Sequence, residues 1–171
     1  QGIAEGRGGA RGPENVWGSA ATAALCALYG LRKPSLKPLL AVAYVSSLAT
    51  KLSDTLASEV GKAYGKTCYL STTLKRVPPG TEGAVSLEGT LAGFAGSVVA
   101  ALYAVAVGLT PRAALLPVVV AAFVATTCES WLGAGAQGKV KWLTNEVINF
   151  LNTLIGAGVG AALSFRLFNL Y

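Results

Sequence analysis

Five apolar stretches, each near the length that crosses a lipid bilayer, limit what this chain can fold into. They cover residues 16–31, 36–61, 84–109, 113–133 and 143–168, and the first is short for a span. A helix needs about 20 mainly apolar residues to cross a bilayer. Lipid offers the backbone no hydrogen-bonding partners, so such segments fold as helices. The sequence therefore predicts an all-α, polytopic membrane helix bundle with about five transmembrane helices.

Composition agrees with a membrane protein, because only 13% of the residues are charged and 53% are hydrophobic. Soluble domains carry about 25% charged residues. The chain begins at Gln1 and contains no Met. We therefore expect residues 1–171 to form a single membrane domain that is the C-terminal part of a longer protein. Membrane lipids are its expected surroundings, and no nucleic-acid partner is expected.

The polar residues of the predicted helices gather toward one membrane face. Successive helices alternate in direction, so the N-terminal segment, the 62–83 loop and the 134–143 loop share a face. Eight of the 14 Lys and Arg residues lie there, which favours a cytosolic or stromal side. Most acidic and Asn side chains occupy the helix ends at the same face: Asp54, Glu59, Glu82, Glu88, Glu129, Asn145, Glu146, Asn149 and Asn152.

Helical spacing places several of these polar residues on common faces. Ser47, Lys51, Asp54 and Ser58 recur at intervals of four, three and four residues, and the Asn residues of the last helix behave alike. Polar stripes on membrane helices face a bundle interior or a watery cavity. The sequence thus predicts a polar pocket that opens to one side and has an apolar floor.

Carboxylates beside Lys and Arg at a membrane face indicate a metal-bound anion. Mg²⁺ binds oxygen ligands and often shares them between one or two carboxylates and substrate phosphates. Asp54, Glu59 and Glu129 are the best candidates for catalytic and metal-binding carboxylates. The alternative is that these carboxylates are simply solvated at helix ends.

The loop before the third long helix has the composition of a phosphate-binding segment. Gly80, Thr81, Gly83 and Ser86 precede a helix start, where free N–H groups favour phosphate. The alternative is a turn followed by helix packing through glycine. Lys75 and Arg76 are candidates for contacting phosphate or lipid headgroups.

Two segments approach a P-loop but do not match it. Residues 61–67 have three residues between their glycines where a P-loop has four. Residues 133–140 have the correct glycine and lysine spacing, but Val140 stands where a P-loop has the Ser or Thr that binds Mg²⁺. Both follow membrane helices and not a strand, so a P-loop protein is excluded.

Four motifs, in order, resemble the integral-membrane phytyl-phosphate kinase family. The residues of these motifs are most similar to those of its plant plastid members. They are SDTLASEVGKAYGK, TLKRVPPGTEGAVSLEGTLAG, TTCESWLGAGAQGK and LTNEVINFLNTLIGA. The resemblance implies an enzyme that transfers a phosphoryl group from CTP, or another nucleoside triphosphate, to phytyl monophosphate. The product would supply tocopherol and phylloquinone synthesis, and the chain would lie in a chloroplast membrane.

The resemblance also implies a set of site residues. Asp54 and Glu59, the 80–83 loop with Ser86, and Glu129–Ser130 with Gln137 would form the site, with Asn145 and Asn149 at the start of the last motif. Relatives often have Asp-Ser where this chain has Glu129–Ser130, so the charge is kept and the reach changes. Our hypothesis is that the three carboxylates hold Mg²⁺, that Lys75, Arg76 and the Gly80 loop hold the triphosphate, and that Arg7 or Arg11 binds the acceptor phosphate.

The sequence contains no His, which removes His-based acid–base chemistry from these residues. A phosphate monoester acceptor is already ionised near neutral pH, so it needs no strong general base. Two alternatives stay open. One is a cytidylyltransferase that attaches CMP to a lipid phosphate, and the other is a transporter of ions or small solutes.

Overall fold

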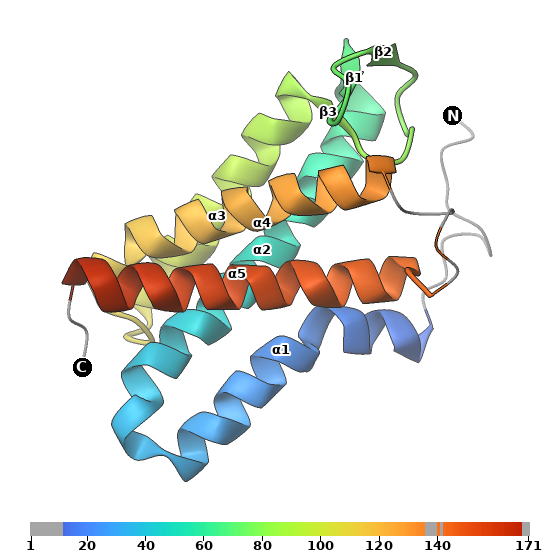
Figure 1. The fold of residues 1–171 in the computed structure, drawn as a ribbon. Helices are drawn as coiled ribbons and strands as arrows, with labels where there is room; N and C mark the ends of the chain where they lie inside the picture. The colour runs from blue at the N-terminus through green and yellow to red at the C-terminus, as the bar shows by residue number, and fades with distance from the viewer. Residues whose placement is uncertain (1–11, 136–139, 141, 169–171) are drawn as a thin grey trace.

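The structure, a computed structural model, describes residues 12–135, 140 and 142–168 as a helix bundle with a small sheet at one end (Figure 1). The long helices are α1 (Pro13–Arg32), α2 (Lys37–Tyr64), α3 (Leu87–Ala106), α4 (Leu115–Gly135) and α5 (Asn145–Phe168). Short 3-10 helices, η2 (Pro34–Leu36) and η3 (Arg112–Ala114), precede α2 and α4. The strands are β1 (Cys68–Leu70), β2 (Arg76–Val77) and β3 (Ala84–Ser86).

The predicted helical membrane bundle is confirmed, but only three of the five long helices in the described chain have the length and composition of a membrane span. Three helices of the described chain are long and apolar enough to cross a membrane: Leu87–Ala106, Arg112–Gly135 and Asn145–Leu167. The second helix falls short by composition because it carries Lys51, Asp54 and other charged residues. The polar residues in its middle, Ser46, Ser47, Thr50 and Ser53, are buried inside the bundle.

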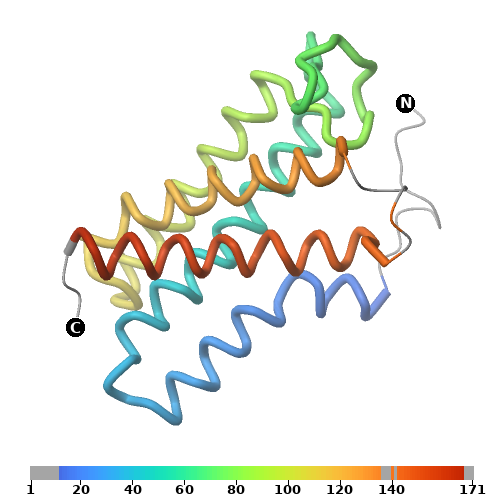
Figure 2. Tube along the Cα trace, in the orientation of Figure 1, coloured from blue at the N-terminus to red at the C-terminus, as the bar shows by residue number. Residues whose placement is uncertain are grey.

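α2 is the central helix of the bundle. It contacts each of the other four long helices, and α5 crosses it (Figure 2). Its buried residues include Ser46, Ser47, Thr50 and Ser53. Polar side chains are costly in hydrocarbon, so a helix with this stripe is stable in a membrane only when its neighbours cover the stripe.

The end of the bundle away from the sheet contains the apolar core. Its members come from α2, α3, η3 and α4 and are small: Val42, Val45, Ala49, Ala101, Ala104, Ala114, Val118 and Ala122. Small residues let membrane helices approach closely, which strengthens van der Waals packing. This core forms the predicted apolar floor beneath the polar end of the bundle.

Glycines of α5 allow its close contact with α2. A Cβ atom at Gly156 would lie 2.1 Å from Thr50 Oγ1, and one at Gly160 would lie 2.0 Å from Ser46 Oγ. Neither position tolerates a side chain without movement of the helices. Gly156 and Gly160 thus form a GxxxG pattern whose role is close helix packing.

Gly156→Val should destabilise the bundle, because the new side chain would collide with Thr50 on α2. Overpacking of this kind costs about 1–3 kcal/mol. Gly158→Val is the matched control on the same helix, since nothing lies within 4 Å of a Cβ there. Thermal unfolding of the purified protein in detergent measures both. Equal melting temperatures for the two variants would contradict this account of the α2–α5 contact.

The segment between α2 and α3 folds back over the polar end of the bundle. Its strands form an antiparallel sheet in the order β2-β1-β3, with Cys68 opposite both Val77 and Ser86. The sequence predicts a turn-rich, non-helical loop here, and the sheet was not predicted. Strands of two or three residues are too short to show the alternating pattern that identifies a strand. The sheet fixes where the 78–83 loop lies relative to the helices.

Candidate functional site

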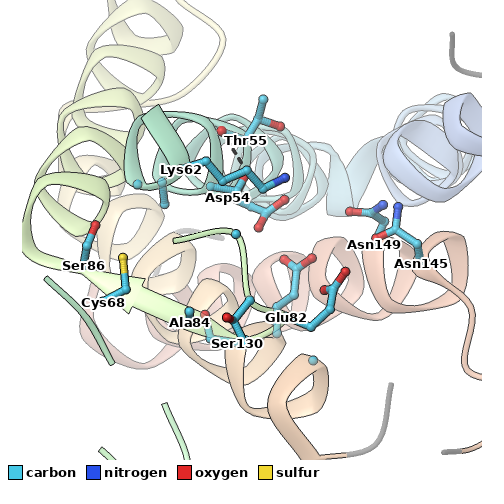
Figure 3. Close-up of a pocket in the computed structure, with 18 of the residues that line it drawn as sticks. Asp54, Thr55, Lys62, Cys68, Glu82, Ala84, Ser86, Ser130, Asn145 and Asn149 are labelled. Carbon is cyan, nitrogen blue, oxygen red and sulfur yellow. Dashed lines mark hydrogen bonds between the residues drawn. The ribbon is translucent and has the colours of Figure 1, made fainter. Parts of the chain in front are cut away.

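A polar pocket lies where the sheet meets the ends of α2, α4 and α5 (Figure 3). Its volume is about 160 Å³, and α2, α4, α5 and the segment that leads into α3 all contribute to its wall. Figure 3 shows Ser86 and Cys68 at one end and Asn145 and Asn149 at the other. The structure therefore brings together the polar helix ends that the sequence places on one membrane face.

Lys51 lies deep in the pocket and joins two helices. Its Nζ donates to Asp54 Oδ2 at 2.8 Å and to Asn149 Oδ1. The Lys51 and Asp54 side chains are only 16% and 17% exposed. An ion pair this deep is weakly screened by solvent, and its charges act strongly on any ion that enters the pocket.

Glu129 of α4 completes a carboxyl pair with Asp54. Their carboxyl groups lie close enough to interact electrostatically, and Asn152 Nδ2 on α5 donates to Glu129 Oε2. Two carboxylates in contact repel each other unless a positive charge lies with them. Lys51 supplies one such charge, and three helices are thereby linked through one polar network.

The 78–83 loop lines the pocket on the side of the sheet. Gly80 and Gly83 have positive φ angles of 86° and 71°, which favour glycine. Gly83 also lies against α4, because a Cβ there would be 2.3 Å from the backbone nitrogen of Ala134. Thr81 donates to the Pro78 carbonyl at 2.8 Å. The loop is thus held in one shape at the pocket, as a phosphate-binding segment must be.

Ser86 has a structural task besides lining the pocket. It ends β3 and caps α3, and its Oγ accepts from the Gly89 N–H at 3.1 Å. The N-terminal end of α3 therefore points its partial positive charge toward the pocket region. Both interpretations of this segment, phosphate binding and helix packing, are compatible with the geometry.

Of the twelve predicted site residues, eight line the pocket, three do not, and Gln137 lies outside the described residues. The eight that line it are Asp54, Gly80, Thr81, Gly83, Ser86, Glu129, Asn145 and Asn149. Glu59 is 56% exposed and faces Lys62 Nζ at 3.9 Å, outside the pocket. Lys75 is exposed, and Arg76 donates to Thr67 Oγ1 at 3.2 Å.

Three predicted contacts fall on residues that the structure does not describe. Gln137, Arg7 and Arg11 lie outside the described residues. Their proposed roles stay predictions. Lys51 and Asn152 belong to the charged network, although neither was predicted to be a site residue. Both occupy polar faces of their helices, and this spacing is the signal that could have identified them.

The residues of the pocket fit a magnesium ion that is shared with substrate phosphates. Asp54 and Glu129 line the pocket and offer carboxylate oxygens. Asn152 is not in the pocket lining, but it contacts Glu129, and its buried Oδ1 has no hydrogen-bonding partner among the described residues. No group of three or more His, Cys, Asp or Glu residues gathers in that part. Mg²⁺ typically takes one or two carboxylates and completes its shell with phosphates and water.

In the described part of the chain, three helices apolar enough to cross a membrane and a charged pocket at one end of the bundle are the features of an integral membrane protein. The family model described as integral membrane protein DUF92 matches residues 1–157. The chain belongs to this family, and the resemblance to an integral-membrane family with a plastid member is confirmed.

Three curated relatives are similar to this chain. An uncharacterized membrane protein of Synechocystis sp. is 58% identical over 159 residues, which cover 92% of this chain and 62% of that protein. The chloroplastic protein VTE6 of Arabidopsis thaliana is 47% identical over 163 residues, or 92% of this chain and 49% of VTE6. An uncharacterized membrane protein of Methanocaldococcus jannaschii is 31% identical over 70% of this chain and 49% of that protein.

The chain therefore spans 49–62% of the length of these relatives. It is more similar to the cyanobacterial protein than to the plant protein. The motif residues, in contrast, predict a plant plastid member. No solved structure matches the chain.

Proposed function

We propose that this chain forms the site of a phytyl-phosphate kinase, which transfers a phosphoryl group from CTP or another nucleoside triphosphate to phytyl monophosphate. The observation that carries the proposal is the network of Lys51, Asp54 and Glu129 inside a polar pocket at a membrane face. The motif resemblance and the similarity to the chloroplastic protein VTE6 support the choice of reaction. The relatives favour a plastid or cyanobacterial membrane as its location.

The proposed reaction needs charge neutralisation and positioning more than proton removal. A phosphate oxygen of the acceptor attacks the γ-phosphorus, the bond from the γ-phosphorus to the bridging oxygen breaks, and CDP leaves. The acceptor monoester has its second pKa near 6, so its attacking oxygen carries no proton at neutral pH. Phosphoryl transfer of this kind depends on alignment and electrostatic stabilisation. A pocket without histidine can perform it.

Each pocket residue has a defined task in this mechanism. Asp54 and Glu129 would hold Mg²⁺, which would neutralise charge on the nucleotide phosphates when bound. Lys51 would exchange its contact with Asp54 for a phosphate oxygen. The Gly80–Gly83 loop and the N-terminal end of α3 would direct backbone N–H groups at the triphosphate. Glu59 is not included, because it lies outside the pocket.

The position of the apolar core favours an enzyme over a transporter. A transport path must reach both membrane faces, and the end of the bundle opposite the pocket is closed by buried Ala and Val residues. A cytidylyltransferase could use the same pocket but would release pyrophosphate.

Analysis of the nucleotide products tests the proposal. The full-length membrane protein is incubated with phytyl monophosphate, CTP and Mg²⁺, and the nucleotides are separated by chromatography. We expect CDP to form in proportion to the lipid product and to stop forming when EDTA removes the metal. Release of pyrophosphate with a CMP-bearing lipid would overturn the kinase in favour of the transferase.

A further inference from the structure

A second cavity of about 280 Å³ adjoins the polar pocket on the α3–α4 side of the bundle. We call it the apolar groove, and its characteristic residues are Thr90, Phe94, Ser97, Phe123, Thr127 and Trp131. Phe94, Phe123 and Trp131 are 49%, 53% and 56% exposed. In a membrane bundle these exposed aromatic faces meet lipid, so the groove opens toward the bilayer.

The groove and the polar pocket share part of their walls. Six residues line both cavities: Asp54, Ala57, Ser58, Ala84, Ser86 and Ser130. A ligand in the groove would therefore lie against residues that also border the polar pocket, Asp54 among them. The polar end of the groove lies at Ser86 and Ser130, and its apolar end lies at Ser97 and Phe123.

The groove has the length and polarity that an amphiphile with a phosphate head requires. Ser86 and Ser97 are eleven residues apart, so the α3 wall is about 16 Å long. Small residues, including Gly93 and Thr127, leave the space between the aromatic side chains. An isoprenoid chain gains free energy by remaining in apolar surroundings, while its charged head must stay in the polar pocket.

We propose that the apolar groove between α3 and α4 holds the isoprenoid chain of the acceptor while its phosphate lies in the polar pocket. This inference rests on the proposed function for the reaction, but the position of the chain is an independent claim about the groove. It predicts that groove residues decide which acceptor chain lengths are used, whereas the polar pocket decides the chemistry.

Thr127→Trp should block the groove midway between Phe123 and Trp131, which lie one helical turn to either side on α4. Val124→Trp is the matched control, since Val and Thr have the same shape and Val124 is exposed outside the groove. We expect Thr127→Trp to raise KM for phytyl monophosphate at least about tenfold, as loss of apolar contacts does in other pockets. Turnover of a five-carbon isoprenyl monophosphate should not change. Val124→Trp should leave both acceptors unaffected.

An unchanged KM for phytyl monophosphate in Thr127→Trp would overturn the proposal and leave the kinase function intact. Equal losses with both acceptors would also overturn it. Photolabelling separates failure of the groove from failure of the function. A C20 isoprenyl monophosphate with a diazirine at its chain end should label groove peptides of the wild type and much less of Thr127→Trp, whether or not the protein turns it over. Equal labelling by a photoreactive phospholipid would show an ordinary lipid site and contradict the proposal.

Discussion

Asp54→Asn should lower phosphoryl transfer to phytyl monophosphate by about a hundredfold to a thousandfold, the range seen when one electrostatic group of an active site is removed. Asp54 lies at the centre of the charged network, in contact with Lys51 and with Glu129. Asn has the same shape but no charge, so the pocket would lose half of its carboxylate pair. The Asn oxygen can still accept from Lys51, and the bundle should remain folded.

Glu59→Gln is the matched comparison for this substitution. Both residues are acidic, both belong to α2, and the sequence assigns both to the metal site. Only Asp54 lines the pocket, and Glu59 is half exposed beside Lys62. We expect Glu59→Gln to keep near wild-type turnover and to need no more Mg²⁺ than the wild type. Full activity in Asp54→Asn would contradict the proposed role of Asp54 in metal binding. Equal losses of activity in the two variants would contradict it as well.

Lys51→Met should abolish most activity and also destabilise the bundle. Met has a similar length but no charge, so Asp54 and Glu129 would be left in contact without their cation. Removing one partner of a buried ion pair costs about 3–5 kcal/mol. Thermal unfolding in detergent should show the loss. Lys37→Met, at the exposed N-terminal end of the same helix, is the control and should change neither property.

A double variant separates the structural role of Lys51 from its chemical role. Lys51→Met with Asp54→Asn removes both charges, so stability should recover toward that of the wild type. Activity should stay lost, because neither the phosphate-binding cation nor the carboxylate pair is present. A Lys51→Met variant that is as stable and as active as the wild type would contradict both roles.

The sequence predicted the bundle and the polar face because both depend on local patterns. The length of the apolar stretches indicates helices, and alternating helix directions place the polar ends of α2, α4 and α5 together. Spacing also identified the stripe of Lys51 and Asp54 on α2. These patterns are properties of single helices and need no knowledge of tertiary packing.

Helix rotation explains why Glu59 does not line the pocket with Asp54. Glu59 is five residues after Asp54, and at 3.6 residues per turn this is about 140° around the helix. The stripe itself omits Glu59, so the spacing already separated the two carboxylates. Glu59 was predicted to be a site residue because it is near Asp54 in the sequence and lies at the same predicted membrane face.

The hydrogen bonds between helices and the position of the sheet depend on long-range contacts, which local sequence patterns do not predict. The hydrogen bonds from Lys51 to Asn149 and from Asn152 to Glu129 join helices distant in the sequence. The sheet directs Lys75 and Arg76 away from the pocket while it brings Gly80 and Gly83 toward it. Its strands are too short to be recognised from the sequence, so the position of each loop residue could not be predicted.

The most direct test of the central claim is transfer of label from γ-³²P-CTP to phytyl monophosphate by the full-length protein with Mg²⁺. The account predicts a radioactive lipid diphosphate whose terminal phosphate carries the label. It also predicts that Asp54→Asn membranes form almost none, while Glu59→Gln membranes form it normally. An unlabelled lipid with all four γ-labelled nucleoside triphosphates, from protein shown to be folded, would contradict the account.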